Sequence, residues 1–149
     1  MDIDERMRIE RACERLVTTY CHFIDHGEAG RVAELFTEDG VWRSPEITMD
    51  GIESLRKGFA HRQNRTDRMS RHVCNNLIVD VVDADHATGC VYLTLYNHDG
   101  DTERPFSPLD GARLIGEYRD EFRRTAEGWR FSRREIHVSF VRPAPADSK

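Results

Sequence analysis

Apolar residues recur every three or four positions in the first part of the chain, which is the spacing of a helix with one buried face. The longest such stretch spans residues 5–26, and Gly27 then supplies a helix stop. A short second helix is predicted over 29–36. A third opens where Asp50 precedes Glu53 by three residues, as in a capping box. The apolar stripe of the first helix consists of Ile9, Ala12, Cys13, Leu16, Tyr20 and Phe23.

From Ser70 onward the period changes to two, which predicts strands. A short strand beginning at Val41 is expected after an Asp39-Gly40 turn. Alternation places His72, Cys74, Asn76 and Ile78 on one face of the first long strand, and Cys90, Tyr92, Thr94 and Tyr96 on one face of the second. Helices gathered before an antiparallel meander indicate an α+β fold. The four long strands are predicted to begin at Ser70, Ala87, Arg113 and Trp129.

The composition narrows the class of protein further. The chain has 149 residues, of which 33% are charged and 38% hydrophobic, with a net charge of −5. This predicts one globular domain over 1–142 followed by a flexible tail over 143–149. The basic residues are scattered, so no nucleic-acid partner is expected. No apolar run approaches the ~20 residues that span a bilayer, and the N-terminus lacks a signal peptide, so we expect a cytoplasmic protein with no membrane partner.

Metal chemistry is not indicated by the sequence. The four cysteines form no CxxC pair, and no HExxH motif occurs. We therefore expect neither a metal requirement nor a cofactor.

Several segments together resemble the SnoaL-like family of the nuclear transport factor 2 fold. They are Tyr20-Cys21-His22-Phe23-Ile24-Asp25, the run from Ala33 to Trp42, Asp50-Gly51-Ile52, Arg71-His72 with Asn76, and Gly128-Trp129-Arg130-Phe131. The resemblance covers residues 9–140. It implies a cone-shaped half-barrel of curved, mainly antiparallel sheet packed on three N-terminal helices around one pocket.

Within that fold the chain is most similar to lyases of the scytalone dehydratase, bile-acid 7α-dehydratase and hexachlorocyclohexane dehydrochlorinase type. These resemble metal-free elimination catalysts built on an aspartate–histidine pair, whose positions Asp25 and His72 match. Tyr20 matches a tyrosine that precedes the aspartate in the bile-acid enzyme. The second histidine and second tyrosine of the scytalone enzyme have no assigned counterpart here, so the resemblance does not identify the substrate.

The residues themselves support the same chemistry. Asp25 falls in the last helical turn, where the helix dipole disfavours a carboxylate, so it should have a donor or cationic partner. An inward-facing His72 opposite it could act as a general base, because imidazole titrates near neutral pH. Tyr20, on the apolar stripe, could hold a carbonyl or leaving oxygen. Each also has a structural alternative: a solvated acid, a hydrogen-bonded core histidine and a core aromatic residue.

The predicted activity is a cofactor-independent, dehydratase-like elimination on a small cyclic, largely apolar metabolite. Four further residues are expected to bind the substrate: Trp42, Asn76, Tyr92 and Tyr96. The alternatives are an isomerase of the same fold, a non-catalytic small-molecule binder, and a dimerisation module. An acid–base pair favours the enzyme, because a binder has no need of one.

A homo-oligomer, a dimer in the simplest case, is also expected. Apolar residues alternate onto faces of the sheet that one pocket cannot all use, and large exposed apolar patches mark interfaces. The residues on which this expectation rests are Val73, Leu77, Val79, Val91, Leu93 and Leu95.

Overall fold

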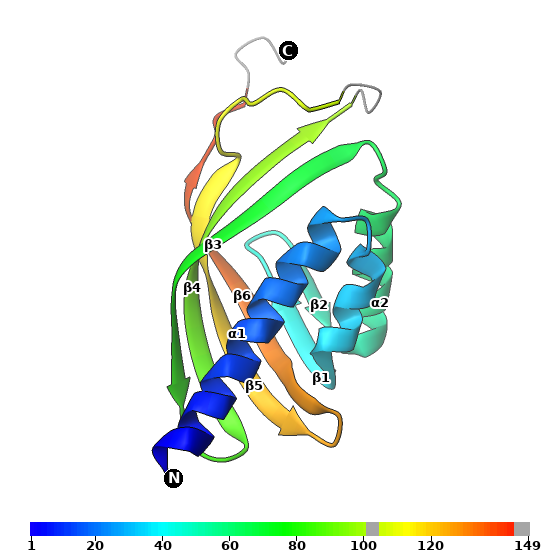
Figure 1. The fold of residues 1–149 in the computed structure, drawn as a ribbon. Helices are drawn as coiled ribbons and strands as arrows, with labels where there is room; N and C mark the ends of the chain where they lie inside the picture. Colours follow the sequence, from blue (N-terminus) through cyan, green and yellow to red (C-terminus); the bar gives the residue numbers. More distant parts are fainter. Residues whose placement is uncertain (101–104, 145–149) are drawn as a thin grey trace.

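A computed structural model describes residues 1–100 and 105–144 of the chain (Figure 1). Residues 101–104 and 145–149, the latter most of the predicted tail, lie outside the described residues. Three helical segments and six strands follow one another in the order α1 (Ile3–Asp25), η1 (Ala29–Leu35, a 3-10 helix), β1 (Phe36–Arg43), β2 (Thr48–Asp50), α2 (Ile52–Gln63), β3 (Arg68–Val81), β4 (His86–Asp99), β5 (Leu114–Thr125) and β6 (Gly128–Val141).

Helix α1 has the boundaries that its capping residues favour. The side chain of Asp2 accepts a hydrogen bond from the Glu5 backbone N–H at 2.8 Å, which satisfies one of the free donors of the first turn. The helix ends at Asp25, and Gly27 follows with a φ of +79°, which favours glycine. Its buried stripe faces the sheet and consists of Ile9, Cys13, Leu16, Val17, Tyr20, Cys21 and Ile24. None of the helices in the described ranges has the length and apolar content needed to cross a bilayer.

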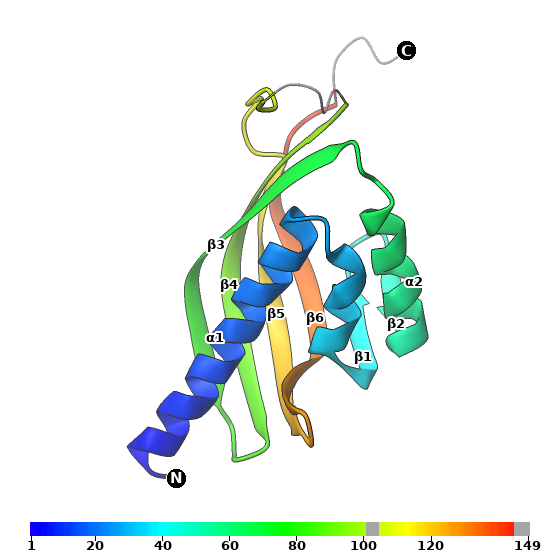
Figure 2. The same cartoon turned by 45° about the vertical axis from the view of Figure 1, so that its right-hand side comes forward.

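The six strands form one sheet in the order β2-β1-β6-β5-β4-β3. Neighbouring strands are antiparallel except for β1 and β6, which are parallel. The sheet curves around α1 without closing, because β2 and β3 remain its two edges (Figures 1 and 2). The core lies between the helices and this curved face, as the predicted α+β half-barrel requires.

Two local predictions around β1 are wrong. Asp39-Gly40 is not a turn before a strand but lies within β1, where the pairing with β6 shifts register between Phe36 and Val41 and absorbs the extra residues. Asp50 does not cap α2, because it belongs to β2. Gly51 takes the N-cap position at a φ of +87° and without a side-chain cap.

A bulge in β3 changes which of its side chains face the helices. The pairing with β4 shifts between Asn75 and Ile78, and Asn76 has a φ of +59°. Before the bulge His72 and Cys74 are half-buried, whereas beyond it Asn76 and Ile78 are exposed. The predicted common face of these four residues therefore ends at the bulge, because one extra residue reverses the alternation.

The apolar residues from which an oligomer was predicted mostly lie inside. Val91 and Leu93 are buried in the core, and Leu77, Val79 and Leu95 pack against it. Only Val73 is exposed, at 42%. The curved sheet encloses more of its apolar residues than simple alternation predicts. Five of the six residues are therefore not available to an interface, and the argument for an oligomer from them is wrong.

Candidate active site

The centre of the candidate site is a carboxylate–imidazole pair that joins α1 to β3. The Oδ1 atom of Asp25 lies 2.6 Å from Nδ1 of His72, and its Oδ2 accepts the His72 backbone N–H at 2.7 Å. Ser70, which the sequence did not single out, donates its hydroxyl to Oδ1 at 2.8 Å. The side chains of Asp25 and His72 are only 5% and 10% exposed. The hydrogen bond predicted between them is therefore present.

These contacts determine the ionisation of the carboxylate. Burial alone would raise the pKa of Asp25, but the His72 ring, the His72 backbone N–H and the Ser70 hydroxyl together lower it below the ordinary value. Asp25 is thus an anion at neutral pH. A carboxylate held in this way fixes the orientation of an imidazole and stabilises its protonated form.

His72 also lines a large cavity. Nδ1 is engaged by Asp25, and Nε2 has no hydrogen-bond partner among the described residues. The cavity has a volume of about 910 Å³, within the range of sites for small organic ligands. His72 lines it together with apolar side chains from the helices and sheet, including Ile24, Trp42, Phe59, Leu93, Leu95, Leu114, Tyr118, Ile136 and Val138.

Tyr20 and Trp42 meet at the wall of the same cavity. The indole Nε1 of Trp42 donates to the Tyr20 hydroxyl at 2.9 Å, and both residues line the cavity. Tyr20 is only 1% exposed, and burial raises its pKa to about 12 despite the opposing charge of Arg134. The hydroxyl is therefore protonated at neutral pH. Because indole N–H is only a donor, Tyr20 retains its own proton to donate.

Arg134 is a second feature that the sequence analysis missed. Its guanidinium is completely buried and forms a two-point ion pair with Asp120, at 2.8 and 3.0 Å. It also lies over the rings of Tyr20 and Tyr118, 4.3 and 3.8 Å from their centroids. Burial would lower the pKa of Arg134, but the Asp120 carboxylate more than offsets this effect and raises it. A permanent cation therefore lies directly behind the Tyr20 ring.

The remaining predicted binding residues are not brought to the cavity. Asn76 is exposed because the bulge turns it outward. On β4 the inward face carries Leu93, Leu95 and Asn97, so Tyr92, which is 54% exposed, and Tyr96 lie on the other face. The alternation of β4 was predicted correctly, but its aromatic face was wrongly assigned to the pocket. Of the four, only Trp42 lines the cavity.

Within residues 1–100 and 105–144, no group of three or more His, Cys, Asp or Glu side chains is placed to hold a metal ion.

A curved sheet with three helices on one face and an inward aspartate–histidine pair defines a pocket protein of the nuclear transport factor 2-like fold. The sequence matches the SnoaL-like domain over residues 5–135, and the chain belongs to this family. A search of curated proteins finds no significant match.

Solved structures support the same fold. A scytalone dehydratase-like protein from Novosphingobium aromaticivorans is 23% identical, with 99% of each chain covered and a TM-score of 0.79. The hexachlorocyclohexane dehydrochlorinase LinA type 2 is 19% identical, with 97% of this chain and 95% of that chain covered and a TM-score of 0.78. A nuclear transport factor 2-like protein with a cystatin-like fold, also from N. aromaticivorans, is 23% identical over 96% of this chain and 85% of that one, with a TM-score of 0.71.

Proposed function

We propose that the protein is a cofactor-independent lyase that eliminates water or halide from a small cyclic, largely apolar molecule. One observation carries the proposal: the buried Asp25 carboxylate engages Nδ1 of His72, while the same imidazole lines a cavity of about 910 Å³. An imidazole base that a carboxylate orients through one ring nitrogen, and that lines a largely apolar cavity, is suited to removing a proton from carbon.

The reaction would divide between three side chains. Nε2 of His72 takes a proton from the carbon next to an activating group, and Asp25 stabilises the imidazolium that forms. The electron pair of the broken C–H bond becomes the new C=C bond as the bond to the neighbouring hydroxyl or halide breaks. A departing hydroxide takes up the proton that the His72 imidazolium carries and leaves as water, whereas a halide leaves as the anion. Tyr20 donates its hydroxyl proton in a hydrogen bond to the departing or carbonyl oxygen, and Arg134 behind its ring favours the negative charge that develops there.

Two printed names among the structural neighbours point to the same reaction class. One neighbour is a scytalone dehydratase-like protein and another is a dehydrochlorinase, and both names describe eliminations. At 23% and 19% identity they share the fold, so the choice of reaction rests on the pair and cavity of this chain.

The test is a panel of cyclic β-hydroxy ketones and chlorinated cyclohexanes, each in a neutral and a carboxylated form, incubated with the protein in D₂O and followed by proton NMR. Elimination should appear as new vinylic signals. With an active substrate, His72→Ala should lower the single-turnover rate by about 10²–10⁴-fold and leave the ligand dissociation constant nearly unchanged, because proton transfer matters only in the transition state. Asp25→Asn should be comparably severe. Tyr20→Phe should lose less rate if the hydroxyl only orients the substrate.

The chain offers a matched control for this experiment. His86 also pairs with an aspartate, Asp83, at 3.0 Å, but both side chains are exposed in the turn between β3 and β4. His86→Ala should therefore leave the rate unchanged. Near wild-type turnover in His72→Ala would refute the proposed mechanism.

The isomerase alternative is separated by the same spectra. Exchange of a substrate proton for deuterium, or migration of a double bond without loss of the leaving group, would identify an isomerase. Ligands that bind in the cavity but undergo neither exchange nor elimination would identify a non-catalytic binder.

A further inference from the structure

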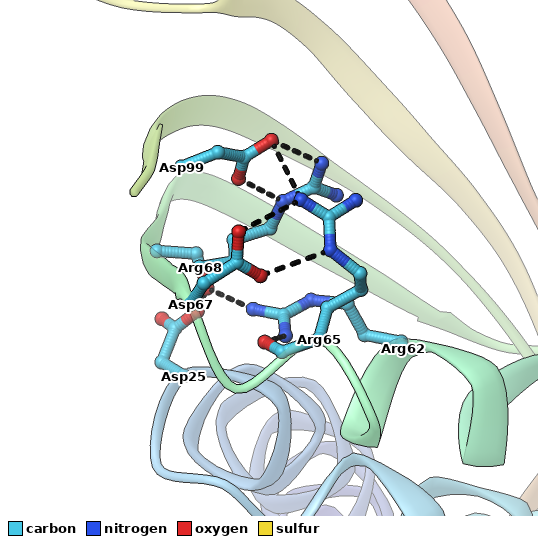
Figure 3. Close-up of polar contacts among 7 residues, drawn as sticks. Asp25, Arg62, Arg65, Asp67, Arg68 and Asp99 are labelled. Carbon is cyan, nitrogen blue, oxygen red and sulfur yellow. Dashed lines mark hydrogen bonds and ion pairs between the residues drawn. The ribbon is translucent and has the colours of Figure 1, made fainter. Parts of the chain in front are cut away.

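Three arginines stand where α2 ends and β3 begins, and all three line the cavity. These rim arginines are Arg62, Arg65 and Arg68 (Figure 3). The described residues that line the cavity include five permanent cations, namely Lys57, Arg62, Arg65, Arg68 and Arg113, and one acid, Glu46. The chain as a whole has a net charge of −5. The cavity lining is therefore positively charged, although the protein as a whole is negatively charged.

Two of the rim arginines are held by acids. The Asp99 carboxylate accepts hydrogen bonds from Nε of Arg68 at 2.6 Å and from Nη2 of Arg68 at 2.8 Å. It also contacts Nη2 of Arg65 at 3.0 Å. Asp67 contacts Nε of Arg65 at 3.0 Å. Figure 3 shows that the Asp99 carboxylate contacts both guanidinium groups. Asp67 and Asp99 thus hold Arg65 and Arg68 and connect the α2–β3 turn to the end of β4, whereas neither acid forms an ion pair with the third arginine.

Arg62 is that third cation. Its Nη2 donates to the Ser70 hydroxyl at 2.9 Å and its Nη1 to the Arg65 carbonyl at 3.5 Å, but it forms no ion pair with any residue that the structure describes. It is half-buried, and burial followed by the charge of Arg68 lowers its pKa, although the charges of Asp25 and Asp99 act in the opposite direction. A half-buried guanidinium without a direct ion pair is stabilised when an anion binds to it.

We propose that the ligand of this cavity carries an oxyanionic group, which Arg62 binds at the rim while the apolar ring extends inward to His72. This inference rests on the proposed function for the cavity but adds the substrate class: an amphiphilic acid and not a neutral ring compound. A planar guanidinium with five donors suits a carboxylate or a phosphate ester, and Arg62 still has donors to offer.

The position of Arg62 also orients such a ligand. Arg62 donates to Ser70, and Ser70 donates to the same Asp25 oxygen that contacts His72. An anion bound at Arg62 therefore lies on the side of Ser70 away from Asp25. The ring would then lie along the apolar wall with its reacting carbon toward Nε2 of His72.

The experiment compares two fluorescent probes that share one aromatic skeleton. Anilinonaphthalene sulfonate carries an oxyanion, and N-phenylnaphthylamine lacks it. The sulfonate should bind the wild-type protein at least roughly 10-fold more tightly, as expected for a hydrogen bond to a charged group, and this preference should weaken with added salt. Arg62→Gln should abolish the preference by weakening the sulfonate alone, and Arg62→Lys should retain part of it.

A matched control lies on the same helix. Arg56 is exposed and pairs with Glu53, so Arg56→Gln should change neither affinity. Displacement of the sulfonate by naphthoate and by naphthyl phosphate, with naphthol as the neutral reference, shows whether the natural group is a carboxylate or a phosphate. Equal affinity for both probes, equal weakening of both by Arg62→Gln, or binding of neither would overturn the inference.

The result is independent of turnover. His72→Ala should keep the preference for the sulfonate, because His72 does not contact the rim group in this arrangement. Failure of the elimination assay with intact anion selectivity would refute the proposed reaction and leave this inference standing. Loss of the preference for the sulfonate with intact elimination would refute this inference and leave the proposed reaction standing.

Discussion

At the scale of single residues, the Asp25 carboxylate carries both the proposed chemistry and part of the stability. It is nearly buried and receives hydrogen bonds from the His72 ring, the His72 backbone and Ser70. Each bond is made to the charged form, which is why the pKa of the folded state is lower than that of the unfolded chain. The anion therefore stabilises the fold as long as it remains ionised.

This arrangement predicts a specific pH dependence of stability. Because the folded pKa of Asp25 is depressed, its contribution is complete above the unfolded value of ~3.9 and is lost as the pH falls through the folded value. The thermal midpoint of the wild-type protein should fall more steeply below about pH 4 than that of Asp25→Asn. Parallel curves for the two proteins over pH 3–6, with each midpoint measured by circular dichroism, would contradict this view of Asp25.

The residues at the site differ in how readily the sequence reveals them. Asp25 and His72 could be predicted because they match the aspartate–histidine pair of the lyases that the chain resembles; the helix-end position of the carboxylate and the strand alternation supported this choice. Arg134 and Asp120 were missed although the strand alternation indicates their burial. Asp120 lies on the same strand face as the buried Tyr118 and Phe122. Arg134 lies on the same strand face as the buried Ile136. Opposite charges on the apolar faces of neighbouring strands indicate a buried ion pair. The roles of Ser70 and Arg62 depend on contacts between elements, which no local pattern encodes.

At the scale of elements, the helices and the long strands follow from periodicity, whereas irregularities within strands do not. The 3-10 geometry of η1 extends over seven residues, and the register shift in β1 and the bulge in β3 are short, but none of them changes the average hydrophobic pattern. The bulge nevertheless changes which side chains of β3 face the helices. Because of it, Asn76 lies outside the pocket in which alternation had placed it.

The bulge depends on a backbone conformation that few residues adopt easily. Asn76 has a φ of +59°, a region that asparagine and glycine tolerate and other residues adopt at a cost. Asn76→Ala should destabilise the protein by about 1 kcal/mol, and Asn76→Gly should be neutral or slightly stabilising. Urea unfolding measures both. Asn75→Ala, at the neighbouring exposed strand position, should stay within about 0.5 kcal/mol of wild type, and a similar loss in Asn75→Ala and Asn76→Ala would argue against backbone strain.

At the scale of the whole molecule, the outer face of the sheet carries a row of side chains across four strands. Val73 pairs with Thr94, Thr94 with Ile115, and Ile115 with Phe140. The three apolar members are 42%, 39% and 68% exposed. The homodimer thus stays a prediction. It now rests on the exposed apolar side chains of Val73, Ile115 and Phe140 and not on the six residues first considered.

We expect two copies to associate through that row, because covering it removes apolar surface from water on both partners. Light scattering at micromolar concentration should give the mass of a dimer. Phe140→Glu should shift the protein toward monomer. Phe106→Glu should not, although Phe106 is 77% exposed, because it lies in the loop after β4 and not on the row. A wild-type monomer would refute the prediction.

The position of β3 gives its bulge a further consequence. This strand has fourteen residues and is one of the two rims of an open sheet, so one side of its backbone could serve as a template on which other chains add as strands and aggregate. Regular addition needs evenly spaced N–H and C=O groups, and the irregularity between Asn75 and Ile78 interrupts that spacing near the middle of the strand. The same kink that turns Asn76 outward therefore also disfavours the addition of another strand at this edge.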